Sequence, residues 1–175
     1  MTHSPISYVS NRVLKLNVGF LLSSGPAHSH DSAHDLPVVR VSDDLMLKYI
    51  RGPLRLSRTK EGLLVQARLQ AAVDSECFRC LDPIEQDITV DLEELYTFHF
   101  NATTEFRIND DGILDLAPLL RAEVLISLSQ RALCRPDCAG LCPECGVNWN
   151  HETCTCNLDN IDPRLAKLQE LLDVN

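Results

Sequence analysis

Residues 133–156 read LCRPDCAGLCPECGVNWNHETCTC and hold six of the eight cysteines in the chain. The other two lie upstream in ECFRCLDP, residues 76–83. The eight cysteines form four close pairs, which are Cys77–Cys80, Cys134–Cys138, Cys142–Cys145 and Cys154–Cys156. Two thiolates this close in sequence can bind one metal ion from a single turn, and two such pairs complete a tetrahedral shell. The spacing therefore predicts two structural Zn2+ ions, each with four cysteine ligands.

The grouping of the pairs follows from their separation along the chain. Only eight residues separate Cys145 from Cys154, which is enough for a small loop that folds back. Gly146 permits the tight backbone that lets amides donate hydrogen bonds to thiolate sulfurs. We therefore expect the last four cysteines to bind one ion and the first four to bind the other. His151 could replace one cysteine as a ligand.

Three other states of the cysteines stay open from the residues alone. They could be free and buried, although four close pairs argue against this state. They could form disulfides, but the N-terminus lacks a basic region followed by an apolar run, so we expect no secretory signal. We expect a cytoplasmic protein, in which thiols stay reduced. Cys77 and Cys80 could act as a thioredoxin-like redox pair, although no βαβ pattern surrounds them.

Length, hydrophobic content and charge restrict the class of protein and its partners. A chain of 175 residues with 45% hydrophobic content fits one domain with one core. No apolar stretch approaches the length needed to cross a bilayer, so we expect no membrane association. The formal net charge is −9, and two ions with four thiolates each would bring it to about −13. Such a protein has no global attraction to nucleic acid, so any RNA contact must be local.

One concentrated basic stretch offers such a local contact. Residues 45–60 contain no aspartate or glutamate, and their cations are Lys48, Arg51, Arg55, Arg58 and Lys60. The planar fork of arginine suits phosphate oxygens, so the stretch predicts a contact with RNA or with an acidic partner. The alternative is an exposed strand face that has no partner.

Alternating hydrophobicity predicts a mostly antiparallel sheet. Two half-buried strands are expected from Val65 to Val73 and from Ile88 to Phe100, and the Cys77–Cys80 pair lies in their connection. Further strands are expected at 13–22, 37–42 and 46–58. Gly52-Pro53 interrupts the last of these, which predicts a bulge or an edge strand.

Residues 23–36 are expected to form a loop instead of a strand. They are polar, contain glycine and proline, and are rich in histidine. Their histidines, His28, His30 and His34, could bind a transition metal. A solvated loop is the interpretation that the polar composition favours.

The hydrophobic period changes to 3.6 residues after Asp115, which could cap the one main helix. Asp162-Pro163, followed by regularly spaced leucines, predicts a short C-terminal helix. The fold class is therefore α+β: a mostly antiparallel sheet with one main helix, a C-terminal Cys-rich zinc module and a short C-terminal helix. We expect residues 1–133 to form the α+β domain, and residues 134–175 to form the module and the last helix, packed as one unit with it.

No catalytic constellation emerges from the sequence. There is no Gly-rich phosphate loop, no serine nucleophile elbow and no HExxH motif. Every cysteine belongs to a pair, whereas a cysteine nucleophile would stand apart with a histidine partner. A shell of four cysteines also leaves the metal no open coordination position. We therefore expect a protein that is not an enzyme and that has no small-molecule substrate.

Four segments of the chain carry a resemblance to a known family. They are, in order, ECFRCLDPIEQDITVDLEELY, ILDLAPLLRAEVLISL, LCRPDCAGLCPECGVNWNHETCTC and DPRLAKLQELL. Together they resemble the YceD family, also called the large ribosomal RNA subunit accumulation proteins. The paired cysteines of the family fall on the eight cysteines of this chain, and Arg79 occupies its arginine position. Trp149 stands where an aliphatic residue is usual, and the His-rich loop resembles an insertion.

The resemblance implies a non-enzymatic factor in the biogenesis of the large ribosomal subunit, which supports the accumulation or processing of 23S rRNA. The implied partners are 23S rRNA or its precursor and a ribosomal protein of the large subunit. The acidity of the chain argues that a basic ribosomal protein is the primary contact. The alternative function is a zinc-stabilised protein–protein adaptor outside ribosome assembly.

Overall fold

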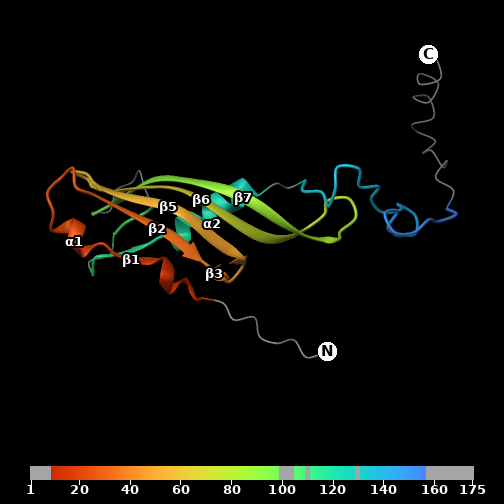
Figure 1. The fold of residues 1–175 in the computed structure, drawn as a ribbon, viewed down its shortest axis with the longest axis horizontal. Coiled ribbons are helices and arrows are strands. Elements are labelled where there is room, and N and C mark those ends of the chain that lie inside the picture. Colours follow the sequence, from red (N-terminus) through yellow and green to blue (C-terminus); the bar gives the residue numbers. More distant parts are fainter. Residues whose placement is uncertain (1–8, 99–104, 109–110, 129–130, 157–175) are drawn as a thin grey trace, which may run out of the picture.

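The centre of the fold is an antiparallel sheet of four strands in the order β2-β5-β6-β7. The structure is a computed structural model, which describes residues 9–98, 105–108, 111–128 and 131–156. The strands of the sheet are β2 (Ser29–Leu36), β5 (Tyr49–Arg58), β6 (Gly62–Glu76) and β7 (Pro83–Thr97). Figure 1 shows the cysteine-bearing loops beyond one end of this sheet.

Smaller elements surround the sheet. Two short pairs of strands are β1 (Lys15–Asn17) with β8 (Ile113–Asp115) and β3 (Val39–Ser42) with β4 (Leu45–Leu47). The helices are η1 (Asn11–Leu14), α1 (Gly19–Leu22) and α2 (Ala117–Ser127). Helix α2 packs against β7 and β3. In the part of the chain that the structure describes, no helix is long and apolar enough to span a membrane.

The core lies between one face of the sheet and α2. Alternate residues of a strand point to opposite faces, and Val65 and Leu69 of β6 are buried on the core face. Leu120 and Val124 of α2 belong to the same cluster, together with buried side chains of the N-terminal elements. The apolar stripe of α2 is thus covered by the apolar face of the sheet, as expected for an amphipathic helix.

Strands β6 and β7 extend beyond the rest of the sheet. Their pairing continues without a break from Gly62↔Thr97 to Glu76↔Pro83, whereas β5 reaches β6 only as far as Tyr49↔Ala72. The ends of β6 and β7 therefore form a two-stranded arm. The loop 77–82 closes this arm and carries the first two cysteines, toward the right in Figure 1.

The predicted fold class is confirmed: a mostly antiparallel sheet with one main helix and two groups of four cysteines. The expected strands around Val65–Val73 and after Ile88 are the long strands β6 and β7. The N-cap residue of the main helix is Leu116 instead of Asp115, but Oδ1 of Asp115 accepts a hydrogen bond of 2.9 Å from the N–H of Ala117, the first residue of the helix. The expected C-terminal helix lies outside the described residues, as does Phe100.

Two expectations for the N-terminal region are wrong. The His-rich region 23–36 is not a loop throughout, since Ser29–Leu36 forms β2 and pairs with β5. This pairing supplies backbone hydrogen bonds that a polar composition does not reveal, and an exposed edge strand tolerates polar side chains. Residues 13–22 are not one strand, because their chain is divided among η1, β1 and α1.

The expectation for Gly52-Pro53 is wrong as well. Strand β5 lies inside the sheet, and its register with β6 is the same on both sides of the dipeptide, with Arg51↔Gln70 and Leu54↔Ala67. There is therefore neither an edge strand nor an inserted residue. Gly52 has a φ of 147°, and a Cβ there would lie 2.3 Å from the carbonyl oxygen of Arg68. The glycine is required by this close approach of two strands.

Candidate metal centres

The first four cysteines meet at the end of the two-stranded arm. The Sγ atoms of Cys77, Cys80, Cys134 and Cys138, which we call the inner cluster, all lie within 4.8 Å of one another. The Sγ–Sγ distance is 3.8 Å between Cys77 and Cys138 and 3.6 Å between Cys80 and Cys134. A tetrahedral Zn2+ site with Zn–S bonds of about 2.3 Å has sulfur–sulfur edges of about 3.8 Å. The inner cluster therefore fits a zinc ion.

Backbone hydrogen bonds hold the loop of the arm against the segment that follows α2. The N–H of Leu81 donates to the carbonyl of Cys77 at 2.9 Å, which closes the turn around the pair. The N–H of Phe78 donates to the carbonyl of Ala132 at 2.8 Å. The guanidinium of Arg79 donates to the carbonyl of Cys138 at 2.9 Å. The arginine between the first two cysteines thus joins the two halves of the inner cluster.

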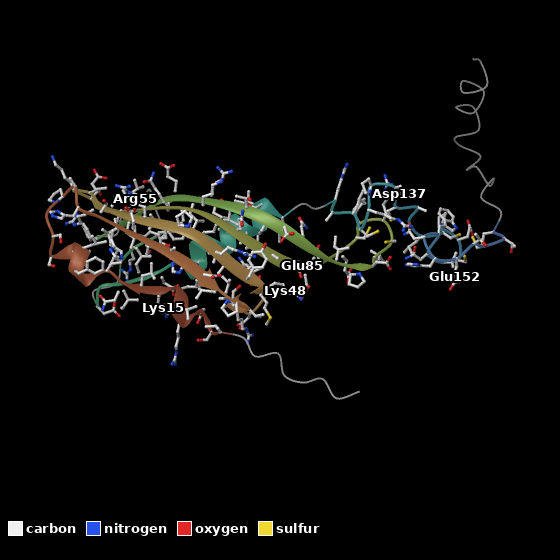
Figure 2. The ribbon with its side chains drawn as sticks, viewed as in Figure 1. Lys15, Lys48, Arg55, Glu85, Asp137 and Glu152 are labelled. Atoms are coloured by element: carbon white, nitrogen blue, oxygen red, sulfur yellow. The ribbon has the colours of Figure 1, made fainter. Side chains whose placement is uncertain are left out.

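The last four cysteines form a second group, which we call the outer cluster. The Sγ atoms of Cys142, Cys145, Cys154 and Cys156 also lie within 4.8 Å of one another. A tight turn places the first pair: the N–H of Gly146, whose φ is 76°, donates to the carbonyl of Cys142 at 2.9 Å. Figure 2 shows sulfur atoms in the loops that carry Asp137 and Glu152. The grouping by spacing is the grouping that the structure displays.

The inner cluster contains thiols of opposite acidity. Burial raises the pKa of Cys77, but the backbone N–H groups of Cys134 and Cys80 outweigh burial and lower it to about 6. Burial raises the pKa of Cys80 well above its usual range. The second pair shows the same contrast: burial raises the pKa of Cys138, but hydrogen bonds from Asn150 and Gly140 outweigh burial and lower it, whereas burial raises the pKa of Cys134. Two thiolates therefore form readily, while crowding and burial oppose the other two. A divalent cation at the centre would remove this opposition.

The outer cluster shows the same contrast. The indole N–H of Trp149 donates to Sγ of Cys154 at 3.3 Å and, with the amide of Cys156, lowers the pKa of Cys154 to about 7. Contact with the thiol of Cys145, followed by burial, raises the pKa of Cys156 to about 12. Trp149 therefore stabilises the thiolate form of Cys154.

In the described ranges, the structure does not show the disulfides, the His151 ligand or the histidine metal site that the sequence left open. All eight cysteines are free of disulfide bonds. His151 is not part of either cluster, because its Nε2 lies 3.3 Å from a carboxylate oxygen of Asp82. Among the described residues, the two cysteine clusters are the only groups of three or more side chains that could hold a metal. The histidines of β2 form no such group; the ring of His30 instead packs against Phe20.

The five predicted contact residues for RNA or a partner do not share one surface. Arg51 and Arg55 lie on the open face of the sheet, opposite the core. Arg58 points to the other face, where its guanidinium stacks 4.1 Å from the ring centre of Phe98. Lys48 forms an ion pair of 3.0 Å with Asp74 of β6, and Lys60 lies in the turn between β5 and β6. A role of these residues in binding stays a prediction.

Arg68 is a basic residue of the open face that the sequence analysis missed as a candidate. It lines a hollow with Arg51 and a second, adjacent hollow with Arg55. Acidic neighbours pair with two of these arginines, at 3.7 Å from Arg55 to Asp31 and at 3.6 Å from Arg68 to Asp91. Only the pairing of β5 with β6 brings Arg68 beside the other two, so linear proximity could not reveal it.

The sequence analysis also missed Asp82, Asn148 and Asn150, which surround the clusters. Asn148 donates to both carboxylate oxygens of Asp82 at 3.1 Å, and Asn150 donates to Sγ of Cys138 at 3.3 Å. Their positions beside or between ligand cysteines are the signal that could have identified them, since ligands require hydrogen-bonded neighbours.

Comparison with known proteins places the chain among relatives. Residues 65–172 match the family described as large ribosomal RNA subunit accumulation protein YceD. The uncharacterized protein Rv2926c of Mycobacterium tuberculosis is 34% identical over 154 residues, which cover 82% of this chain and 72% of the relative. The uncharacterized protein YlbN of Bacillus subtilis is 27% identical over 100 residues, 55% of this chain and 58% of the relative. No solved structure matches. The chain therefore belongs to the YceD family of large ribosomal RNA subunit accumulation proteins.

Proposed function

We propose that the protein is a non-enzymatic factor in the biogenesis of the large ribosomal subunit, and that it supports the accumulation or processing of 23S rRNA in the cytoplasm. The observation that carries this proposal is the family match over residues 65–172. The matched region contains most of β6, all of β7, helix α2 and both cysteine clusters. We therefore expect the two-stranded arm and the clusters to carry the function that this chain shares with its family.

Two Zn2+ ions are the proposed occupants of the clusters. The four Sγ atoms of each cluster lie within 4.8 Å, which supports tetrahedral coordination. When bound, the ion of the inner cluster would cross-link the arm to residues 134–138, which are distant in the chain, and the ion of the outer cluster would close the short loop from Cys142 to Cys156. Four thiolates complete the coordination shell and leave no position for a substrate or a reactive water. This closed shell supports a role in binding, without catalysis and without a small-molecule substrate.

The proposed partners are 23S rRNA or its precursor and a ribosomal protein of the large subunit. A formal net charge of −9 supports a basic ribosomal protein as the primary contact, because the overall field repels phosphates. The arginines of the open sheet face offer a local contact for RNA, since guanidinium groups bind phosphate oxygens in bidentate fashion. The acidic neighbours of Arg55 and Arg68 restrict this contact to a short segment.

Depletion of the protein in its host tests the proposed function. We expect less mature 23S rRNA, more of its precursors, and a deficit of large subunits in sucrose gradients. The level of small-subunit rRNA is the internal control, and re-expression of the intact chain should restore the profile. Normal 23S rRNA and normal subunit profiles after depletion would refute the proposal. Affinity purification that recovers only a non-ribosomal partner, insensitive to ribonuclease, would favour the adaptor function instead.

A further inference from the structure

We propose that the two cysteine clusters are coupled: residues 148–151, held by the outer cluster, position the ligands of the inner cluster. Metal binding at the outer cluster would then strengthen metal binding at the inner cluster, and the reverse. This inference rests on the proposed metal occupancy of both clusters. It goes beyond that occupancy because it assigns a role to side chains that are not ligands.

The segment 148–151 belongs structurally to the outer cluster. It lies between Cys145 and Cys154, so both of its ends are fixed by ligands of that cluster. An isolated bridge pairs Asn148 with Leu141, next to the first ligand of the outer cluster. The indole of Trp149 donates to Sγ of Cys154. Closing the outer cluster around an ion would therefore hold this segment in place.

The side chain of Asn150 reaches from this segment to the inner cluster. Its Nδ2 donates to Sγ of Cys138 at 3.3 Å. Its Oδ1 accepts hydrogen bonds from the N–H of Ala139 at 2.9 Å and from the guanidinium of Arg135 at 2.7 Å. A donor aimed at a thiolate stabilises the negative charge and holds the sulfur in the direction that coordination needs. Asn150 is thus a positioning residue for a ligand of the other cluster.

A second connection runs through Asp82, which follows the other half of the inner cluster. Asp82 lies 3.2 Å from Sγ of Cys80. Its carboxylate accepts hydrogen bonds from Nδ2 of Asn148 at 3.1 Å and lies 3.3 Å from Nε2 of His151. A carboxylate beside a thiolate is unfavourable unless donors compensate its charge. The segment 148–151 supplies these donors.

The contact of Asn150 with Cys138 and the contacts of Asn148 and His151 with Asp82 should both strengthen metal binding at the inner cluster when the outer cluster holds an ion. Without an ion in the outer cluster, hydrogen bonds alone would hold the loop 146–153, because none of its side chains is buried. The hydrogen bonds to Cys138 and Asp82 would then be made only part of the time. Loss of such supporting hydrogen bonds lowers metal affinity by about 10–100-fold. By linkage, the inner cluster must influence the outer one by the same factor.

Titration of the full-length, metal-free and reduced protein with Co2+ measures the coupling. The thiolate-to-cobalt absorption reports each bound ion, and competition with a chelator yields its affinity. Replacing Cys154→Ser and Cys156→Ser together disables the outer cluster, and we expect the affinity of the inner cluster to fall about 10-fold or more. The reverse pair, Cys77→Ser with Cys80→Ser, should weaken the outer cluster by the same factor. This reciprocity provides a second measurement if one of the variants folds poorly.

The substitution Asn150→Asp tests the contact itself. It keeps the acceptor oxygen and removes the donor to Cys138, so we expect two bound ions, an inner affinity lower by about 10-fold and a shifted absorption band. The control Asn17→Asp makes the same atomic change far from the clusters, where Oδ1 accepts from the N–H of Gly19 at 3.0 Å. This control should titrate like the unmodified protein.

The outcomes separate the coupling from the metal occupancy on which it rests. If the unmodified protein binds no Co2+ or Zn2+, the occupancy is wrong, and the coupling with it. If it binds two ions whose affinities do not change when the other cluster is disabled, the occupancy holds and the coupling is wrong. Equal titrations for Asn150→Asp and the unmodified protein would also overturn the coupling, as would an equal loss in the Asn17→Asp control.

Discussion

The sheet region and the cysteine-bearing region of this protein are held together by different physical means. The sheet region has one apolar core, in which side chains such as Leu47, Ile50 and Leu120 are at most 1% exposed. In residues 131–156 the buried positions are Cys138, Gly140 and Cys142, and most other side chains are accessible. So small a segment buries too little apolar surface to offset the conformational entropy lost on folding. Under the proposed metal occupancy, it depends instead on ions bound by its thiolates.

The largest effect is expected from metal removal. Treatment with a strong chelator under reducing conditions should abolish the protection of backbone amides in 131–156 from hydrogen exchange, because structural zinc sites contribute about 10–16 kcal/mol of apparent binding free energy. Amides of β6 around Leu69 should remain protected, and added Zn2+ should restore the lost protection. If the sheet loses protection together with the clusters, the sheet also depends on the metal ions, and the two regions are not held together by different physical means.

Truncation of a large core side chain should destabilise the sheet region and leave metal binding by the clusters unchanged. Leu120 of α2 is 1% exposed, so Leu120→Ala should lower the free energy of unfolding by about 2–5 kcal/mol. The matched control is Ile126→Ala in the same helix, where a side chain 75% exposed should change stability by less than about 0.5 kcal/mol. Denaturant unfolding and metal analysis together provide the test. The number of bound ions should stay the same in both variants, and a loss of metal with Leu120→Ala would contradict the comparison.

The smallest effect is expected from an exposed ion pair within the sheet region. Asp44 accepts hydrogen bonds at 2.9 and 3.1 Å from Nε of Arg121 in α2, and these bonds lower the pKa of Asp44. Because the folded pKa lies below the unfolded one, the pair stabilises the fold above about pH 4 and this stabilisation is lost as the pH falls through the folded pKa. Asp44→Asn should therefore be slightly destabilising at pH 7, and the difference should shrink at pH 3.

Denaturant unfolding at the two pH values measures this difference. The neighbouring Asp43 pairs with Arg40 of β3 instead of with α2, so Asp43→Asn is the matched control and should cost less at pH 7. A difference between Asp44→Asn and the unmodified protein that grows on acidification would show that the carboxylate does not stabilise the folded state through Arg121.

Much of the sheet region was predictable because a half-buried strand shows a pattern in its own sequence. In β6 and β7, apolar and polar side chains alternate with a period of two, and this pattern is visible without knowledge of the partner strand. Strand β2 lacks this pattern, because its core-facing positions include the polar residues Ser32 and His34, so polar residues occur on both faces. Its pairing with β5 holds it in the sheet. The role of Gly52 was also misinterpreted from the sequence. A glycine is needed there because the carbonyl of Arg68, on the neighbouring strand β6, leaves no space for a side chain.

The amino-acid sequence by itself determined the grouping of the cysteines and the family, because ligand spacing and motif order are properties of the chain that folding does not alter. Only the tertiary structure decided what surrounds the clusters and which arginines share a face. Asp82 meets Asn148, and Arg68 joins Arg51 and Arg55, across separations that strand pairing and the loops at the end of the arm bridge. Contacts of this kind depend on the relative placement of whole elements, and no local pattern encodes that placement.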